Sequence, residues 1–232
     1  MPTTPVAIVT GASRGLGLAL ARELAARGWR LVIDARGAEA LERARAELAR
    51  RTDVTALVGD VTDPRHRRAL VTAAGDRIHL LVNNASRLGP SPQPTLADYP
   101  IDELERVYAT NVIAPLALAQ LALPLMDEGA MVLNVTSDAA VEAYAGWGGY
   151  GSSKAALEQL TRVLAAEHPQ LRVHAVDPGD MNTRMQQEAF PGEDISDRPP
   201  PEASVPGLMA LVEGDRSSGR YEARDLSPAV GA

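Results

Sequence analysis

The stretch Val6-Ala7-Ile8-Val9-Thr10-Gly11-Ala12-Ser13-Arg14-Gly15-Leu16-Gly17 decides the fold. It joins a short apolar, β-branched run, Val6 to Thr10, to a turn that holds three glycines, and an apolar helical pattern follows from Leu18. A strand, a glycine turn and a helix in this order present free backbone N–H groups and a helix N-terminus to a phosphate. The stretch therefore predicts a phosphate-binding turn, although three glycines can also form an ordinary turn.

The alternation of strand and helix continues along the chain. Further strands are predicted at Leu31 to Asp34, Val54 to Val58, Ile78 to Val82, Met131 to Val135, Leu171 to Val176 and Gly219 to Ala223. Helices are predicted at Leu18 to Ala26, Gly37 to Arg51, Arg67 to Ala74, Asp102 to Leu125, Tyr150 to Ala166 and Pro206 to Glu213. We therefore predict an α/β fold, a doubly wound parallel sheet of about seven strands with helices on both faces.

Length and composition limit the classes of function. A chain of 232 residues suits a single domain, residues 1–232, in which the acidic, proline-rich stretch Met181 to Val205 (181–205) is expected to be a substrate lid. The absence of cysteine excludes thiolate metal sites, and the four histidines are scattered, so we expect no metal. A net charge of −7 disfavours nucleic acid and anionic membranes as partners.

No targeting or membrane signal is evident. No segment approaches the roughly 20 continuous apolar residues of a membrane span. The start, Met1-Pro2-Thr3-Thr4-Pro5, lacks a basic region followed by a cleavage site. We expect a cytoplasmic protein that acts on a small molecule.

Tyr150 and Lys154 are the first candidates for chemistry. They are four residues apart at the start of a predicted helix, so they share one face. A phenol beside an ammonium has a lowered pKa, which suits an acid–base catalyst. Such pairs also occur on ordinary solvated helix faces. Lys154, however, is the only lysine in the chain, which favours a chemical role over a general surface cation.

Polar residues and glycines follow several of the other predicted strands. Asp60 follows the third strand, Asn83 the fourth, Ser137 the fifth and Pro178-Gly179 the sixth. Ligands of doubly wound sheets bind at the carboxyl ends of the strands, so these residues are expected to lie together with the glycine turn. Pro115 is expected to break the long helix near Thr110 to Asn111 and to free a carbonyl there.

These residues together resemble the short-chain dehydrogenase/reductase family along nearly the whole chain. The family's T-G-x-x-x-G-x-G is present as Thr10 to Gly17 and its Y-x-x-x-K as Tyr150 to Lys154, and the other signatures match at Asn83-Asn84-Ala85, Asn111, Ser137, Pro178-Gly179 and Thr183. The resemblance implies a Rossmann-type dinucleotide-binding domain. It also implies an oxidoreductase that transfers hydride between a nicotinamide and a small or medium carbonyl compound or secondary alcohol.

The resemblance also implies residue roles. Tyr150 would be the general acid or base, Ser137 would hydrogen-bond the substrate oxygen, and Lys154 would bind the nicotinamide ribose and depress the Tyr150 pKa. Asn111 would anchor a relay water through its backbone carbonyl. The implied cofactor contacts are Gly11, Ser13, Arg14, Gly15, Leu16, Gly17, Arg36, Asp60, Val61, Asn83, Ala85, Tyr150, Lys154, Pro178, Gly179, Met181 and Thr183.

The end of the second strand bears on the choice of nicotinamide. An acidic residue there normally binds the adenine ribose, whereas an arginine accommodates a 2′-phosphate. In Asp34-Ala35-Arg36, Ala35 aligns best with the discriminating position, with Arg36 beside it and Arg14 able to reach the same phosphate. We predict NADP(H), with NAD(H) as the alternative.

The substrate pocket is expected between Ser86 to Tyr99, Asp138 to Trp147 and the lid. Candidate contacts are Tyr144, Trp147, Met185 and Phe190, with Asp138 and Glu142 as polar groups. Ser86 stands where the family usually has glycine, which predicts a less open loop beside the nicotinamide.

Oligomeric state and function each keep an alternative. The short C-terminal region favours a homodimer through the helices Asp102 to Leu125 and Tyr150 to Ala166 over a tetramer. A non-catalytic dinucleotide-binding regulatory protein on the same fold is the alternative function, although such proteins typically lose the tyrosine or lysine. A sugar-nucleotide epimerase or dehydratase is disfavoured because little chain follows Pro178.

Overall fold

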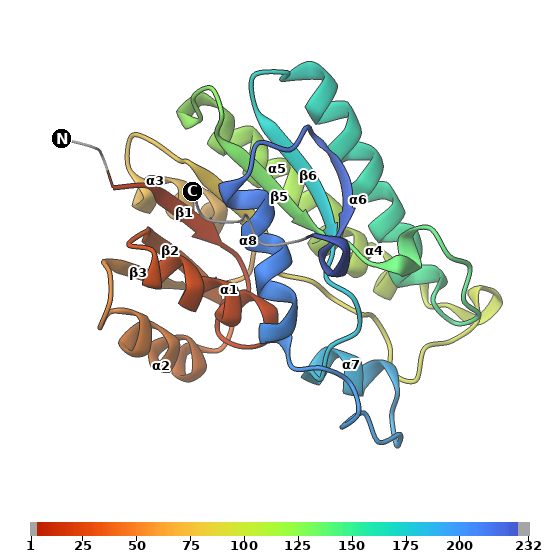
Figure 1. Cartoon of the computed structure of the whole chain (residues 1–232). Coiled ribbons are helices and arrows are strands. Elements are labelled where there is room, and N and C mark those ends of the chain that lie inside the picture. Colours follow the sequence, from red (N-terminus) through yellow and green to blue (C-terminus); the bar gives the residue numbers. More distant parts are fainter. Residues whose placement is uncertain (1–3, 227–232) are drawn as a thin grey trace.

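The computed structural model describes residues 4–226, and within them seven strands form one parallel sheet in the order β3-β2-β1-β4-β5-β6-β7 (Figure 1). The strands are β1 (Val6–Val9), β2 (Arg30–Ala35), β3 (Val54–Val58), β4 (Leu80–Asn83), β5 (Met131–Val135), β6 (Arg172–Asp177) and β7 (Gly219–Glu222). The predicted doubly wound α/β fold is confirmed. Strand order reverses beside β1, between β2 and β4, where such sheets bind their ligands.

Helices cover both faces of the sheet (Figure 1). One face packs against α1 (Gly15–Ala26), α2 (Ala38–Leu48) and α8 (Val205–Glu213). The other packs against α3 (Pro64–Ala74), α5 (Ala114–Ala122) and α6 (Gly148–Glu167), and α4 (Ile101–Tyr108) lies against α6. Because both faces are covered, every side chain of β1 and β4 is buried, which explains the continuous apolar runs that marked them as strands.

The long helical stretch Ile101–Leu125 breaks where the sequence predicted. Between α4 and α5 the backbone forms a π turn, Ala109–Ile113, in which the Ala114 N–H bonds the Ala109 carbonyl. Pro115 follows at once and has no N–H to offer the Asn111 carbonyl four residues earlier.

This stretch is also long and apolar enough to span a membrane by length and composition, with a mean hydropathy of 1.4. The expectation that no segment approaches a span is therefore too strong. Leu118, Ala119 and Ala122 lie in the core beneath the sheet, so packing within the domain accounts for part of this apolar composition.

The stretch 181–205 contains a helix that the sequence pattern did not predict. It is α7 (Arg184–Ala189), which lies beyond the carboxyl ends of the strands (Figure 1). Thr183 starts it, because its hydroxyl accepts from the Gln186 N–H at 3.3 Å. The pattern Thr-x-x-Gln is a recognised helix start, so this signal was present in the sequence.

Candidate active site

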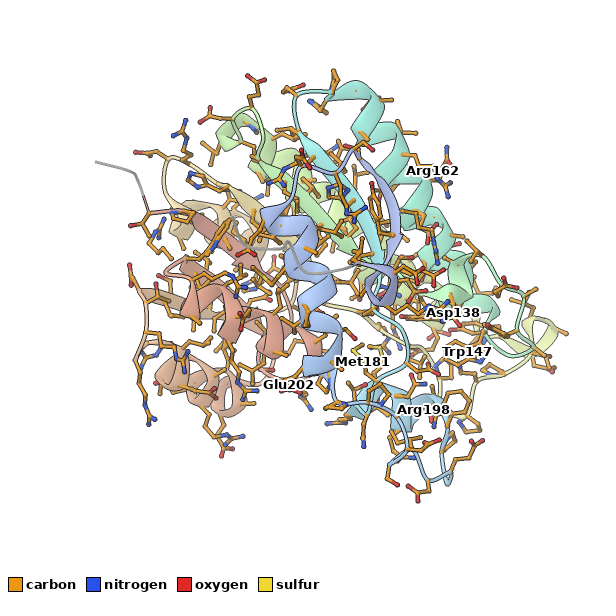
Figure 2. The ribbon with its side chains drawn as sticks, viewed as in Figure 1. Asp138, Trp147, Arg162, Met181, Arg198 and Glu202 are labelled. Atoms are coloured by element: carbon orange, nitrogen blue, oxygen red, sulfur yellow. The ribbon has the colours of Figure 1, made fainter. Side chains whose placement is uncertain are left out.

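A cavity of about 580 Å³ opens at the carboxyl ends of the central strands. Its walls come from the glycine turn after β1, the ends of β2 to β6, the first turn of α6 and the segment that contains α7. In Figure 2, Asp138, Trp147 and Met181 lie toward this side of the sheet, whereas Arg162 lies farther along α6. One cavity thus collects residues from most of the chain.

The glycine turn needs its glycines for steric reasons. Gly11 has a φ of +67°, which side chains rarely adopt. A Cβ at Gly17 would lie 2.5 Å from Asn84 Nδ2 and 2.6 Å from the Gly11 carbonyl oxygen, so only glycine allows this packing. No side chain caps the first turn of α1 and no acidic residue lies in it, which leaves its N–H groups available to an anion.

Asn84, rather than Asn83, faces the cavity. Asn84 Nδ2 donates to the Thr10 carbonyl at 2.8 Å, while Thr10 Oγ1 accepts from the N–H groups of Asn84 and Ala85 at 3.0 Å each. Asn83 instead donates to Asn134 Oδ1 at 2.8 Å inside the sheet and does not line the cavity. The cavity lining therefore contains Asn84 and Ala85 but not the predicted Asn83.

Asp34 at the end of β2 is fully engaged by protein groups. Its side chain is 1% exposed, Oδ1 accepts from the Gly11 N–H at 2.8 Å, and Oδ2 lies 2.8 Å from His66 Nε2. Arg14 and Arg36 also line this end of the cavity, and neither forms an ion pair with the residues that the structure describes. The cavity wall here thus offers two cations, Arg14 and Arg36, while the Asp34 carboxylate is already occupied.

The pair Tyr150 and Lys154 lies in the first turns of α6 and is buried, with 8% and 2% exposure. Glycines on either side of Tyr150 let α6 approach its neighbours: a Cβ at Gly151 would lie 2.5 Å from the Ala139 carbonyl oxygen. Lys154 Nζ donates to the Val135 carbonyl at 2.8 Å and lies 5.5 Å from the centroid of the Tyr150 ring. The predicted shared face is present.

The direction of the Tyr150 pKa differs from the prediction. Burial raises the pKa of the phenol, Asp177 and Asp138 raise it further, and the hydroxyls of Ser86 and Ser137 act in the opposite direction. Burial also lowers the pKa of Lys154 to about 8. The net shift of the Tyr150 pKa is therefore upward, opposite to the lowering expected from Lys154, because desolvation of the phenolate is the largest contribution.

Ser137 lies beside this pair at the end of β5. Its hydroxyl donates to Asp138 Oδ1 at 2.9 Å and accepts from the Ala139 N–H at 3.2 Å, which caps the short turn Asp138–Ala140. Ser137 also acts to lower the pKa of the Tyr150 phenol, against the larger effect of burial. Ser137 therefore combines a structural cap with a position at the cavity.

Asn111 is 1% exposed in the π turn, and its side chain does not line the cavity, although neighbouring Thr110 does. Its amide holds the loop after β4 against α6. Oδ1 accepts from the Arg87 N–H at 2.8 Å, and Nδ2 donates to the Arg87 carbonyl and to Ser153 Oγ, each at 2.9 Å. The side chain thus has a clamping role that the sequence did not indicate.

Apolar side chains surround the Tyr150 ring. The Trp147 ring lies edge-on to Tyr150 with centroids 5.9 Å apart and contacts Phe190 at 5.8 Å. Trp147 and Met185 line the cavity as predicted, whereas Tyr144 and Phe190 contact Trp147 from outside the lining and Glu142 does not reach it.

Most of the predicted site residues meet at this cavity. Those that line it are Gly11, Ser13, Arg14, Gly15, Leu16, Arg36, Asp60, Val61, Ala85, Ser137, Tyr150, Lys154, Pro178, Gly179, Met181 and Thr183. Those that do not are Gly17, Asn83 and Asn111. Lining residues absent from the predicted set include Asn84, Thr136, Asp177 and Asn182, each next to a predicted residue in the sequence. No cluster that could hold a metal ion occurs within residues 4–226.

The comparisons with known proteins agree with this geometry. A family model described as short chain dehydrogenase matches residues 5–194. The chain is 36% identical over 196 residues to the rhamnolipids biosynthesis 3-oxoacyl-[acyl-carrier-protein] reductase of Pseudomonas aeruginosa, covering 78% of this chain and 74% of that one.

Solved structures are similar over nearly the whole length. A short chain dehydrogenase from Pseudomonas syringae superposes with a TM-score of 0.88 at 29% identity, covering 94% of each chain. One from Shigella flexneri, complexed with NADP, gives a TM-score of 0.85 at 27% identity over 95% of this chain and 97% of that one. The chain therefore belongs to the short-chain dehydrogenase/reductase family and is an NAD(P)-dependent oxidoreductase.

Proposed function

We propose that the protein interconverts a small or medium carbonyl compound and its alcohol, with Tyr150 as the group that donates or accepts the proton. The observation that carries this proposal is the convergence of Tyr150, Ser137 and Lys154 on the cavity that begins at the glycine turn. The nicotinamide, when bound, supplies or accepts the hydride. The remaining steps fall to residues of this chain.

Tyr150 is suited to hold a proton until it is needed. Because burial and the carboxylates of Asp177 and Asp138 raise its pKa, the phenol stays protonated at neutral pH and can give its proton to a carbonyl oxygen. Ser137 offers a hydroxyl beside the phenol to position that oxygen. Lys154 keeps a buried positive charge near the phenolate that forms, and Trp147 and Met185 exclude water from the apolar side.

We propose NADP(H) as the preferred cofactor. Both oxygens of Asp34 are taken by Gly11 and His66, so this carboxylate is not free to bind ribose hydroxyls. The exposed guanidinium groups of Arg14 and Arg36 line the same end of the cavity and would hold a 2′-phosphate. The complex of the Shigella flexneri relative with NADP supports the assignment.

An apolar substrate suits the end of the cavity near Tyr150. Leu88, Trp147, Met185 and Ala189 pack around the phenol. The two arginines at this end are already paired: Arg87 Nη2 lies 2.7 Å from Glu103 and Arg184 Nε lies 2.7 Å from Glu188. A carbonyl carried by an aliphatic or aromatic group fits this lining better than a compound that needs a cation for an acidic group. The segment 181–205, which carries Met185 and Ala189, would act as the lid over it.

We also propose a homodimer through the helices Ile101–Leu125 and α6. Ile101, Ile113 and Val163 are exposed large apolar residues on these helices. Light scattering that gave the mass of a monomer at micromolar concentration would refute this proposal.

The function is tested by assaying a panel of aldehydes, ketones and secondary alcohols with both nicotinamides, following the absorbance of the reduced cofactor. We expect turnover of apolar carbonyl compounds with NADPH. Tight cofactor binding without turnover of any compound would instead favour the non-catalytic regulatory function.

A further inference from the structure

A buried pair, His66 and Asp34, lies behind the end of the cavity where Arg14 and Arg36 are found. His66 Nε2 and Asp34 Oδ2 are 2.8 Å apart, and their side chains are 8% and 1% exposed. Asp34 belongs to the cavity wall, whereas His66 does not line the cavity. An ionised carboxylate accepts hydrogen bonds and donates none, so Nε2 is the donor. His66 therefore acts on the cavity through Asp34.

The local structure fixes the position of His66. It is the third residue of α3, whose first turn is capped by Asp63, which accepts from the Arg65 N–H at 2.8 Å. The next residue, Arg67, donates to the Val61 carbonyl at 2.6 Å and ties α3 to the loop after β3. The imidazole is thus presented to Asp34 by a helix start that is held at two points.

The end of β3 leaves room for the imidazole ring. A Cβ at Gly59 would lie 2.2 Å from His66 Nδ1 and 2.6 Å from its Cε1, so any side chain there would displace the ring from Asp34. Gly59 is not among the glycines with a positive φ, so its backbone conformation does not require glycine. The chain therefore supplies both the ring and the space that the ring needs to reach Asp34.

Three other charged side chains line this end of the cavity, namely Arg14, Arg36 and Asp60. Neither arginine forms an ion pair within residues 4–226. Asp60 Oδ1 accepts from the N–H and the hydroxyl of Thr62 at 2.9 and 2.8 Å. The two guanidinium groups can therefore attract an anionic ligand, provided that the carboxylate of Asp34 does not compete for them.

Asp34 is kept from competing by its own hydrogen bonds. Oδ1 accepts from the Gly11 N–H at 2.8 Å, and Oδ2 accepts from His66. Without the His66 donor, Oδ2 would be a buried acceptor with no partner, which is costly. Rotation toward the cavity would relieve that cost by pairing the carboxylate with Arg36 or with ribose hydroxyls. An acidic group at the end of the second strand favours ribose hydroxyls over a 2′-phosphate.

We propose that His66 is a positioning residue that sets the choice of nicotinamide by holding the Asp34 carboxylate inside the wall. This inference rests on the proposed function, in which Arg14 and Arg36 bind a 2′-phosphate. With His66 in place, the end of β2 presents cations and no available carboxylate. Without it, Asp34 would repel a 2′-phosphate and compete for the arginines, so NADPH would lose affinity relative to NADH.

The test measures the dissociation constants of NADPH and NADH by nicotinamide fluorescence. His66→Leu removes the donor, whereas His66→Gln keeps an amide N–H at the same reach. We expect the ratio of the two constants to shift toward NADH by about tenfold in His66→Leu, because an uncompensated carboxylate repels a phosphate and not a hydroxyl. His66→Gln should stay close to the wild-type ratio. His168→Leu is the matched control, since His168 ends α6 and does not line the cavity.

A double variant separates this role from a purely structural one. Asp34→Asn keeps the size of the side chain and removes its charge, so His66→Leu combined with Asp34→Asn should return to near the wild-type ratio. A structural role alone would weaken both cofactors equally and leave the ratio unmoved. Gly59→Ala, which displaces the ring, should shift the ratio in the same direction and carries the test where His66→Leu does not fold.

An unchanged ratio in His66→Leu, or a shift that persists in the double variant, would overturn the proposal. The proposed cofactor fails separately. A wild-type protein that binds NADH more tightly than NADPH would refute the preference for NADP(H), yet His66→Leu should still move the ratio toward NADH and Asp34→Asn should still reverse the change.

Discussion

Lys154 and Tyr150 lie one helical turn apart on α6, yet the Lys154 ammonium bonds the Val135 carbonyl at 2.8 Å and lies 5.5 Å from the centroid of the phenol ring. The ammonium is buried, with a single acceptor among residues 4–226. Burial of the ammonium away from water lowers its pKa to about 8.

This geometry predicts that burial of the Lys154 ammonium lowers the free energy of unfolding. The folded-state pKa of about 8 lies below the reference of 10.5, so the unfolded chain binds this proton more tightly, and folding loses free energy as pH falls from 10.5 to 8. At pH 7 the whole penalty is present. Lys154→Met should therefore raise the free energy of unfolding by about 1–3 kcal/mol in urea titrations, after allowance for the lost Val135 bond.

Lys154→Met should also lose most of its activity. Lys154→Arg should do the same, because a guanidinium does not fit a site built for a compact ammonium. The matched comparison is Arg162→Met, which removes a mostly exposed cation from the same helix. A Lys154→Met protein that is less stable than the wild type at pH 7 would contradict the desolvation penalty.

Arg36→Leu tests the choice of cofactor. If Arg36 binds the 2′-phosphate, its loss should weaken NADPH binding by about tenfold or more and leave NADH binding nearly unchanged. Fluorescence titration of the reduced nicotinamide measures both constants. Arg50→Leu, in the exposed turn after α2, controls for the loss of one surface charge. Unchanged NADPH affinity in Arg36→Leu would refute the assignment of Arg36 to the 2′-phosphate.

The burial of His174 predicts that the folded protein becomes less stable in acid. The ring is fully buried on β6, neither of its nitrogens has a hydrogen-bond partner among the described residues, and burial followed by the charge of Arg172 lowers its pKa from 6.5 to about 4. The unfolded chain therefore binds this proton more readily. The stability that neutral His174 provides is complete above pH 6.5 and falls by about 3 kcal/mol as pH drops to 4.

His174→Leu should remove this part of the pH dependence, because leucine fills the space beside Tyr221 without titrating. Urea titrations from pH 4 to 7 on the wild type, on this variant and on His168→Leu as a surface control would measure it. Identical pH slopes for the wild type and His174→Leu would contradict the prediction.

Much of the fold could be predicted because strands buried on both faces are apolar along their whole length. The run Val6 to Val9 and the glycine turn after it locate β1, and the topology of a doubly wound sheet then brings the strand ends together. Element ends were less well predicted: α6 begins at Gly148, two residues before Tyr150. Gly148 and Gly149 are poor helix formers, so the sequence pattern places the start of this helix at Tyr150.

Three features of the site could not be read from the sequence. Periodicity does not say which of two adjacent asparagines faces the cavity, and the predicted contact, Asn83, is the one that does not line it. The side-chain role of Asn111 depends on Arg87 and Ser153, which are distant in the sequence. The direction in which the Tyr150 pKa shifts depends on the balance between burial and nearby charges, and that balance can be judged only from coordinates.

The most direct test of the proton role is the turnover number of Tyr150→Phe, measured beside Tyr221→Phe, whose hydroxyl bonds only the Ser217 carbonyl in an exposed loop. We predict that Tyr150→Phe loses at least about a hundredfold in turnover while its cofactor dissociation constant stays close to that of the wild type. Tyr221→Phe should keep full activity. Turnover by Tyr150→Phe within a few-fold of the wild type would contradict proton transfer by Tyr150.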